Sequence, residues 1–263
     1  MASLPPPSPS PSSPSSPPTT DDLYIFGYGS LCWKPSLDFA DCPSFTGLIT
    51  NGIDPLPGNS PLPLTSSTLA PSTISPSSRD TYIRTWSQRS CDHRGTPSSY
   101  GIVCNLLKHS ELTTYFDTHP APPPSDSPPD YTLGTLYLLP AATKQSILAS
   151  LDVREKGGYA REFVQVYKWI DATDATDGAS LAPVTALLYR GTSPSDAESL
   201  EYRVCDDKFN FYPRVLYDEM YQARRIAAGV GPSGDNWVYL KQLCDWLKMV
   251  GEKMPRDTAG DTR

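Results

Sequence analysis

Apolar and polar residues alternate in several short stretches of the first three quarters of the chain. A period of two is typical of β-strands, because successive side chains of a strand point to opposite faces. β-branched and aromatic residues dominate these stretches, and glycine, proline or serine bounds most of them. The pattern predicts strands within residues 23–31, 45–50, 81–88, 102–108, 131–139, 161–170 and 182–190.

Helical spacing appears first at residues 141–152, where Ile147, Leu148 and Leu151 share one face. We expect this helix to end before the glycine pair 157–158.

The late part of the chain is mainly helical in pattern. Helical spacing runs from about 196 to 228, the sequence "GPSG" at 231–234 interrupts it, and an amphipathic helix follows over 235–254 with Asp235 as a plausible N-cap. Strands in the middle and helices near the end predict an α+β fold: a small, mostly antiparallel β-barrel or sheet flanked by helices.

Proline- and serine-rich segments divide the chain. Residues 1–20 cannot bury enough apolar surface to offset their ordering entropy, so we expect a disordered tail. Residues 54–80 are a second such block, either a surface insertion or a gene-model artefact, and 119–130 are a proline-rich loop. The prediction is therefore a single domain over 21–252 that carries this insertion and loop, followed by a flexible tail at 253–263.

Charge and composition exclude several classes of protein. The net charge is −7 and the basic residues do not cluster, so nucleic acid is not an expected partner. No run of about 18 apolar residues could span a membrane. The first twenty residues contain no lysine or arginine, which argues against a secretory signal or a transit peptide and predicts a cytoplasmic protein. Reduced thiols are then expected at cysteines 32, 42, 91, 104, 205 and 244.

The sequence "LYIFGYGSLCWKP" at 23–35 places glycine on both sides of Tyr28, where a predicted strand ends. Glycines permit close approach of the backbone, and successive N–H groups in such a turn can bind an anion. The amides of Gly29, Ser30 and Leu31 could therefore hold a carboxylate. A tight turn or β-bulge without a ligand explains the same residues.

The sequence "LDVREKGGY" at 151–159 places Glu155 at the end of an apolar helix beside two glycines. A carboxylate whose pKa is raised by burial can exchange protons near neutral pH, so Glu155 is a candidate general base. A solvated, charged helix terminus is the alternative interpretation.

The sequence "SCDHRGTP" at 90–97 contains two further candidates. Cys91 and His93 would share a face on a strand and could form a thiolate–imidazole pair, although an ordinary polar loop explains them too. Arg94 could hold a carboxylate through two parallel hydrogen bonds. The residues of "GPSG" are most simply a turn that breaks a helix.

These four segments occur in the order found in one family. "IFGYGSL.WKP", "DHRGTP", "LDVREKGGY" and "GPSGDN..YL" together resemble the ChaC-type γ-glutamylcyclotransferases, which degrade glutathione, from about residue 23 to residue 250. The 50–80 block and the region after "TALLYRGT" depart from the family pattern, and the second departure leaves the substrate preference open.

The resemblance implies a role for each matched residue. Tyr28, Gly29, Ser30 and Leu31 would bind the γ-glutamyl group through backbone amides, Arg94 would belong to the substrate site, and Glu155 would be the acid/base. The reaction would be an intramolecular attack that releases 5-oxoproline and Cys-Gly and needs no metal, cofactor or enzyme nucleophile.

The sequence leaves three alternatives open for the substrate and the function. The substrate could be another γ-glutamyl amino acid or amine. The chain could be a non-catalytic binding protein whose proline-rich tail recruits SH3- or WW-type partners. Cys91 could also serve a cysteine-dependent transferase.

Overall fold

The computed structural model describes residues 22–35, 39–50, 82–112, 131–155, 159–169, 183–191 and 218–253. The proposed N-terminal tail, the 54–80 insertion, the 119–130 loop and the chain beyond residue 253 lie outside these ranges, as do the predicted helical residues 196–217. Within the described residues, no helix combines the length and the apolar character needed to cross a bilayer.

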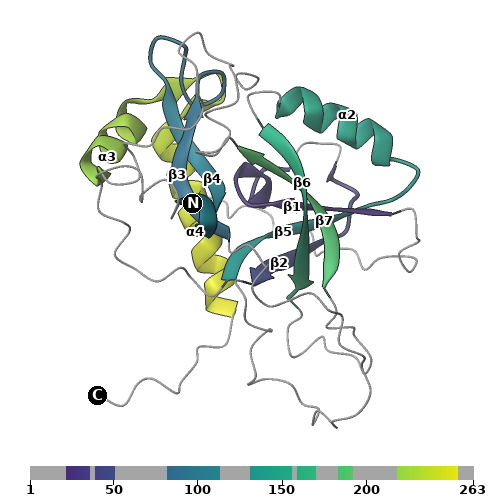
Figure 1. Cartoon of the computed structure of the whole chain (residues 1–263). Helices are drawn as coiled ribbons and strands as arrows, with labels where there is room; N and C mark the ends of the chain where they lie inside the picture. Colours follow the sequence, from purple (N-terminus) through teal and green to yellow (C-terminus); the bar gives the residue numbers. More distant parts are fainter. Residues whose placement is uncertain are drawn as a thin grey trace, which may run out of the picture.

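Five strands close into a barrel (Figure 1). Around the barrel the strands are β1 (Leu23–Gly27), β5 (Tyr131–Leu139), β2 (Ser44–Thr50), β6 (Tyr159–Lys168) and β7 (Val184–Gly191). All neighbouring pairs are antiparallel except β1 and β7, which are parallel. This closure brings the end of β1, where the glycine-rich loop begins, next to the end of β7.

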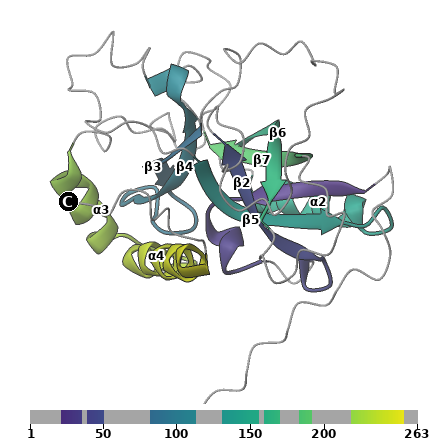
Figure 2. The same cartoon turned by 90° about the horizontal axis from the view of Figure 1, so that it is seen from below.

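A second antiparallel pair lies beside the barrel and consists of β3 (Tyr82–Ser90) and β4 (Gly101–Lys108). The helices α3 (Glu219–Ala228) and α4 (Asn236–Lys253) pack against β4, on the side away from the barrel strands β6 and β7 (Figures 1 and 2). The two-residue strands β8 (Val230–Gly231) and β9 (Gly234–Asp235) join these helices. The chain therefore places its last helices against a hairpin from its middle.

The helix α2 (Lys144–Arg154) covers a different side of the barrel. It buries Ile147 and Leu151 in an apolar cluster with barrel residues, and Leu148 packs partly buried against the same cluster. This is the face that the spacing of apolar residues predicted. Packing of this face positions α2 on the barrel, and Glu155 is the residue that directly follows the helix.

A partly buried charge network joins the β3–β4 pair to the barrel. Glu162 of β6 forms ion pairs with Lys108 of β4 at 2.6 Å and with Arg190 of β7 at 3.0 Å, and the hydroxyl of Tyr82 donates to it at 2.7 Å. Burial opposes ionisation of Glu162, but these donors and charges outweigh it and lower its pKa. Arg190 also pairs with Glu111 at 3.1 Å. The network holds the two β units together across their contact.

The structure confirms the predicted α+β class with its mostly antiparallel small barrel. The segment 23–31 is a strand that runs into a loop, as predicted: β1 ends at Gly27 and a 3₁₀ turn, η1 (Ser30–Cys32), follows. The first predicted helix begins at Lys144 rather than at residue 141. The sequence "GPSG" is not a simple helix break: it forms the β8–β9 hairpin, with Gly234 at a φ of +98°.

Candidate active site

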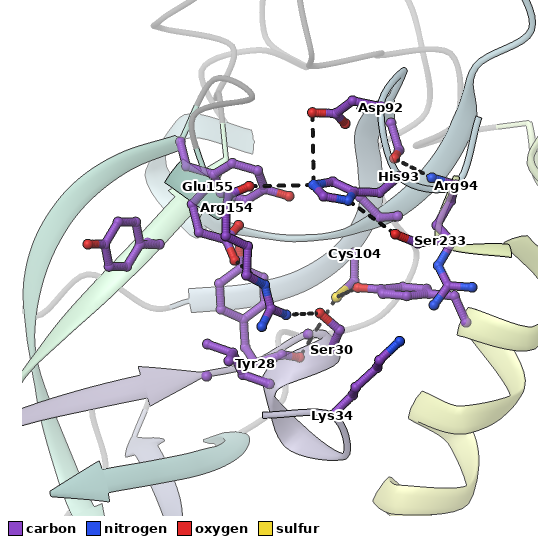
Figure 3. A pocket seen from close by; sticks show the side chains of 18 of the residues that line it. Tyr28, Ser30, Lys34, Asp92, His93, Arg94, Cys104, Arg154, Glu155 and Ser233 are labelled. Carbon is purple, nitrogen blue, oxygen red and sulfur yellow. Dashed lines mark hydrogen bonds and ion pairs between the residues drawn. The ribbon is translucent and has the colours of Figure 1, made fainter. Parts of the chain in front are cut away.

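A cavity of about 320 Å³ opens between the barrel and the β3–β4 pair. Its walls come from the η1 loop, the loop after β3, the end of α2, the start of β6, the β8–β9 turn and α4. All six site residues predicted from the sequence line it: Tyr28, Gly29, Ser30, Leu31, Arg94 and Glu155. Segments more than one hundred residues apart in the chain therefore meet in one pocket (Figure 3).

The loop after β1 contributes backbone to this pocket. Within η1, the N–H groups of Cys32 and Lys34 donate to the carbonyls of Gly29 and Ser30 at 2.9 and 2.7 Å. The N–H groups of Ser30 and Leu31 come too early in the turn to have a partner inside it. The hydrogen bonds of the turn itself therefore do not use these two amides.

Gly29 is the residue of this loop that a side chain would disturb most clearly. A Cβ atom at Gly29 would lie 2.9 Å from the hydroxyl oxygen of Tyr239 and 3.3 Å from Sγ of Cys104. These two atoms contact each other at 3.0 Å and form part of the pocket wall. Only glycine lets the loop approach this wall so closely.

Glu155 caps the C-terminal end of α2, and its N–H donates to the carbonyl of Leu151 at 2.7 Å. Its side chain is 16% exposed and forms an ion pair with Nε of Arg154 at 3.1 Å. Burial raises the pKa of Glu155, and the electrostatic interactions with Arg154 and His93 oppose this shift without cancelling it. A carboxyl group in this state can take up and release a proton closer to neutral pH than an exposed glutamate.

Arg154 also links Glu155 to the glycine-rich loop. Its Nη2 donates to Oγ of Ser30 at 2.6 Å, while its Nε holds the Glu155 carboxylate. Two sides of one guanidinium thus fix the candidate acid/base relative to the candidate binding loop. The sequence pattern placed Arg154 only in a charged helix terminus, because its bridging role depends on the tertiary fold.

Arg94 follows β3, and its N–H donates to Oγ of Ser90 at 2.9 Å. The residue is only 5% exposed. Its Nη1 donates to the carbonyl of Asp235 at 3.0 Å, and its guanidinium carbon lies 5.4 Å from the centre of the Tyr239 ring. Burial lowers the pKa of Arg94, although an arginine stays charged. The positive charge is therefore held at the pocket by a carbonyl and an aromatic ring.

His93 connects three segments at the rim of the pocket. Its Nε2 lies 3.4 Å from the carbonyl oxygen of Arg154, and its Nδ1 lies 3.3 Å from Oγ of Ser233 (Figure 3). A carbonyl oxygen only accepts, so Nε2 carries a proton and donates it to the carbonyl of Arg154. In addition, the N–H of Ser233 donates to the His93 carbonyl at 2.8 Å. The imidazole thereby joins the β8–β9 turn to the end of α2.

The cysteine-based hypothesis does not fit this arrangement. The strand β3 ends at Ser90, so Cys91 and His93 lie in a loop and do not share a strand face. Cys91 is also disulfide-bonded, and this corrects both its predicted reduced state and its candidacy as a nucleophile. Free thiols occur at Cys32, Cys42, Cys104 and Cys244. Burial raises the pKa of the Cys104 thiol, which keeps it protonated in the pocket wall.

Comparison with known proteins identifies the family of the chain. The model of the family described as "ChaC-like protein" matches residues 73–259, which is more than half of the chain. The chain belongs to the ChaC-like family.

Relatives of this ChaC-like chain extend the comparison. It is 28% identical over 229 residues to a protein of Schizosaccharomyces pombe named glutathione-specific gamma-glutamylcyclotransferase, covering 86% of the chain and 83% of the relative. It is 28% identical over 256 residues to glutathione-specific gamma-glutamylcyclotransferase 1 of Rattus norvegicus, covering 95% and 82%.

A solved structure supports the fold of the ChaC-like chain. The crystal structure of a yeast γ-glutamylcyclotransferase specific to glutathione superposes with a TM-score of 0.55 at 22% identity and covers 91% of each chain. At this identity the similarity establishes the fold.

The ChaC-like pocket also contains residues that the sequence patterns did not single out. Lys34, Ser233 and Tyr239 line it, and Tyr159 does so from the start of β6. Burial raises the pKa values of Tyr159 and Tyr239 well above the ordinary range, so both phenols stay neutral. Their positions depend on how α4 and β6 pack, which no local pattern encodes. All four residues lie inside the motifs that carry the family resemblance, and that membership was the available signal, but no role was assigned to them.

Within the described part of the chain, no group of three or more His, Cys, Asp or Glu side chains is placed to hold a metal ion.

Proposed function

We propose that this ChaC-like chain is a γ-glutamylcyclotransferase that cleaves glutathione into 5-oxoproline and Cys-Gly. The names of its relatives support the activity and the substrate. The observation that carries the proposal is Glu155: a mostly buried carboxyl with a raised pKa that lines the same pocket as the glycine-rich loop and Arg94.

The substrate contains both reacting groups. The α-amine of the γ-glutamyl residue attacks the γ-carbonyl of the same residue, a five-membered ring closes, and the bond to the cysteine nitrogen breaks. The protein must hold the substrate bent so that amine and carbonyl approach each other. Orientation of this kind can supply up to about 7–11 kcal/mol of rate acceleration.

Glu155 carries the proton in this mechanism. As a carboxylate it removes a proton from the attacking α-amine, and as a carboxylic acid it donates that proton to the departing cysteine nitrogen. One group with a pKa near the working pH can perform both steps, and such catalysis typically contributes about 10²–10⁴ in rate. The raised pKa that burial gives Glu155 serves this double role.

The remaining predicted residues bind the substrate in this proposal. The N–H groups of the loop Tyr28–Leu31 hold the charged end of the γ-glutamyl group, and they are candidates to stabilise the oxyanion that forms at the γ-carbonyl. Arg94 supplies a buried positive charge that favours an anionic substrate. Arg154 keeps Ser30 and Glu155 at a fixed separation.

Three further points remain proposals. We place the enzyme in the cytoplasm, we assign residues 21–252 to one catalytic domain with 54–80 as an insertion, and we retain SH3- or WW-type partners as weak candidates for the proline-rich tail.

A product assay tests the proposed function. The purified full-length protein is incubated with reduced glutathione and, separately, with γ-Glu-Ala, and 5-oxoproline is measured by mass spectrometry. We expect glutathione to be consumed and γ-Glu-Ala to be spared. Glu155→Gln, which keeps the size of the side chain but cannot exchange the proton, should fold normally and lose at least about a hundredfold in kcat.

Arg161→Met provides a matched control, because Arg161 forms an exposed ion pair with Asp152 and does not line the pocket. This variant should keep normal turnover. Formation of 5-oxoproline by folded Glu155→Gln at the wild-type rate would remove Glu155 from the mechanism. Absence of 5-oxoproline from both substrates with wild-type protein would overturn the proposed activity and favour a binding protein of this fold.

A further inference from the structure

Among the described residues, one cation of the pocket, Lys34, has no side-chain partner. Lys34 follows η1, its side chain is exposed and lines the cavity, and it forms no ion pair or side-chain hydrogen bond with any other residue of the described chain. Its backbone is nevertheless fixed, because its N–H donates to the carbonyl of Ser30 at 2.7 Å. A flexible ammonium group is thus attached at a defined point beside the binding loop.

The other cations that line the pocket are already engaged. Arg154 bonds to Ser30 and Glu155, and Arg94 bonds to a backbone carbonyl and faces the Tyr239 ring. The guanidinium of Arg89 lies 4.5 Å from the centre of the Tyr100 ring. Lys34 is therefore the pocket cation that can turn to a ligand without giving up a contact.

Lys34 lies away from the proposed acid/base. In Figure 3 Glu155 lies on one side of the pocket, while Lys34 lies beyond Ser30 and extends toward the side where Arg94 is found. A ligand whose reacting bond lies at Glu155 would reach Lys34 with a more distant part. Two extended residues span at most about 7 Å, and a lysine side chain adds several ångström of reach.

Glutathione carries a second carboxylate at this kind of distance. One carboxylate belongs to the γ-glutamyl residue, and the other ends the Cys-Gly portion, two residues beyond the bond that breaks. Each charged group that leaves water needs a compensating partner. The loop amides serve the first carboxylate in the proposed function, so the second one needs a partner elsewhere in the pocket.

We propose that Lys34 binds the C-terminal carboxylate of the leaving Cys-Gly portion and thereby selects γ-glutamyl peptides of glutathione's length and charge. This inference rests on the proposed function and adds a specificity residue to it. A γ-glutamyl amine has no second carboxylate, and in γ-Glu-Ala the carboxylate lies one residue nearer to the reacting bond. Lys34 therefore favours glutathione over both rivals.

The experiment compares glutathione with its C-terminal carboxamide, which removes one negative charge and leaves the reacting bond unchanged. For Lys34→Met we expect KM for glutathione to rise about three- to tenfold with kcat nearly constant, as for a partly exposed charge-assisted contact. The wild-type protein should show a similar rise in KM for the carboxamide. For the carboxamide, Lys34→Met should have the same KM as the wild-type protein, because this substrate lacks the carboxylate that Lys34 would bind.

Two variants and the salt concentration complete the test. Lys34→Arg keeps the charge and should stay within about threefold of wild type, whereas Lys34→Glu should be worse than Lys34→Met. Lys248→Met removes an exposed lysine of α4 that does not line the cavity, and it should leave KM unchanged. Added salt should raise KM for glutathione in wild type more than in Lys34→Met.

The outcomes separate this inference from the proposed function. Suppose that wild type forms 5-oxoproline from glutathione. If Lys34→Met then has an unchanged KM for glutathione, or if its KM rises by the same factor for glutathione and for the carboxamide, the Lys34 assignment is wrong and the enzyme assignment stands. If wild type forms no 5-oxoproline, calorimetric binding of glutathione to Glu155→Gln with and without Lys34→Met still measures the contact. Equal affinities in that comparison overturn it.

Discussion

Asn236 joins the start of α4 to β4, behind the wall that holds Arg94. Its side chain is fully buried, its Nδ2 donates to the carbonyl of Ile102 at 2.8 Å, and its Oδ1 accepts from the Ile102 N–H at 2.7 Å. Its own N–H donates to the carbonyl of Gly229 at 2.8 Å. One amide side chain thus pairs both backbone groups of a strand residue that is itself fully buried.

Asn236→Ala removes both side-chain hydrogen bonds at once. The N–H and the C=O of Ile102 then stay buried without these partners, at a cost of about 1–3 kcal/mol for each group. We expect the free energy of unfolding to fall by about 2–5 kcal/mol, which corresponds to a decrease in Tm of roughly 5–15 °C for a chain of this size. This is a large part of the stability of an ordinary domain.

Thermal and urea unfolding of the full-length protein measure the effect. Gln145→Ala, an exposed change on α2, is the control and should stay within about 0.5 kcal/mol. Asn236→Asp keeps an acceptor for the Ile102 N–H, but as a carboxylate it cannot donate to the Ile102 carbonyl. Part of its lost stability should return as the pH falls and the carboxyl group becomes a donor. A loss below about 1 kcal/mol in Asn236→Ala would refute the claim that both backbone groups depend on this side chain.

Three further predictions concern the site and the contact between the β units. Because burial raises the pKa of Glu155, kcat/KM should begin to decrease on the acid side at a pH above the pKa of an exposed glutamate. A decrease that begins only at the pKa of an exposed glutamate would contradict this prediction. Gly29→Ala should lower kcat/KM at least about tenfold while the circular dichroism spectrum stays unchanged, because the new Cβ would lie 2.9 Å from the Tyr239 hydroxyl and displace the loop. Wild-type kcat/KM in this variant would show that the loop can move away from Tyr239 without affecting catalysis. Glu162→Gln should lower the free energy of unfolding by about 1–3 kcal/mol at neutral pH, because it removes the carboxylate that Lys108 and Arg190 share, while Arg190 keeps its ion pair with Glu111. The pKa of Glu162 is lowered in the folded protein, so this difference should shrink as the pH falls through that pKa, and a difference independent of pH would count against the ion pairs.

Local patterns predicted most of the elements of the fold. The strand at 131–139 was predicted with the bounds that it has in the structure, and the buried face of α2 follows the spacing of Ile147 and Leu151. Alternation and helical spacing show which side of a strand or helix is buried, so they can be recognised without knowing which other elements pack against it. The boundary was less accurate at the start of α2, where a turn over residues 141–143 precedes the helix.

The closure of the barrel was beyond these patterns. The parallel pairing of β1 with β7 joins residues about 160 positions apart, such as Ile25 and Leu187. Pairing over this distance depends on how all five strands pack and twist together. The same closure, with α4 against β4, sets the position of the pocket.

The sequence by itself determined the predicted helices and strands and the family resemblance. It also identified Glu155 and the loop Tyr28–Leu31 as candidate functional groups, although a charged helix end and a tight turn without a ligand explained the same residues. Only the tertiary structure decided that these residues share one cavity, that Arg154 bonds to both Ser30 and Glu155, and that Lys34 lines the same cavity with no side-chain partner among the described residues. The physical reason is that a residue type fixes which bonds a side chain can form, whereas burial and distance, which decide its pKa and its partners, arise only when distant segments pack together.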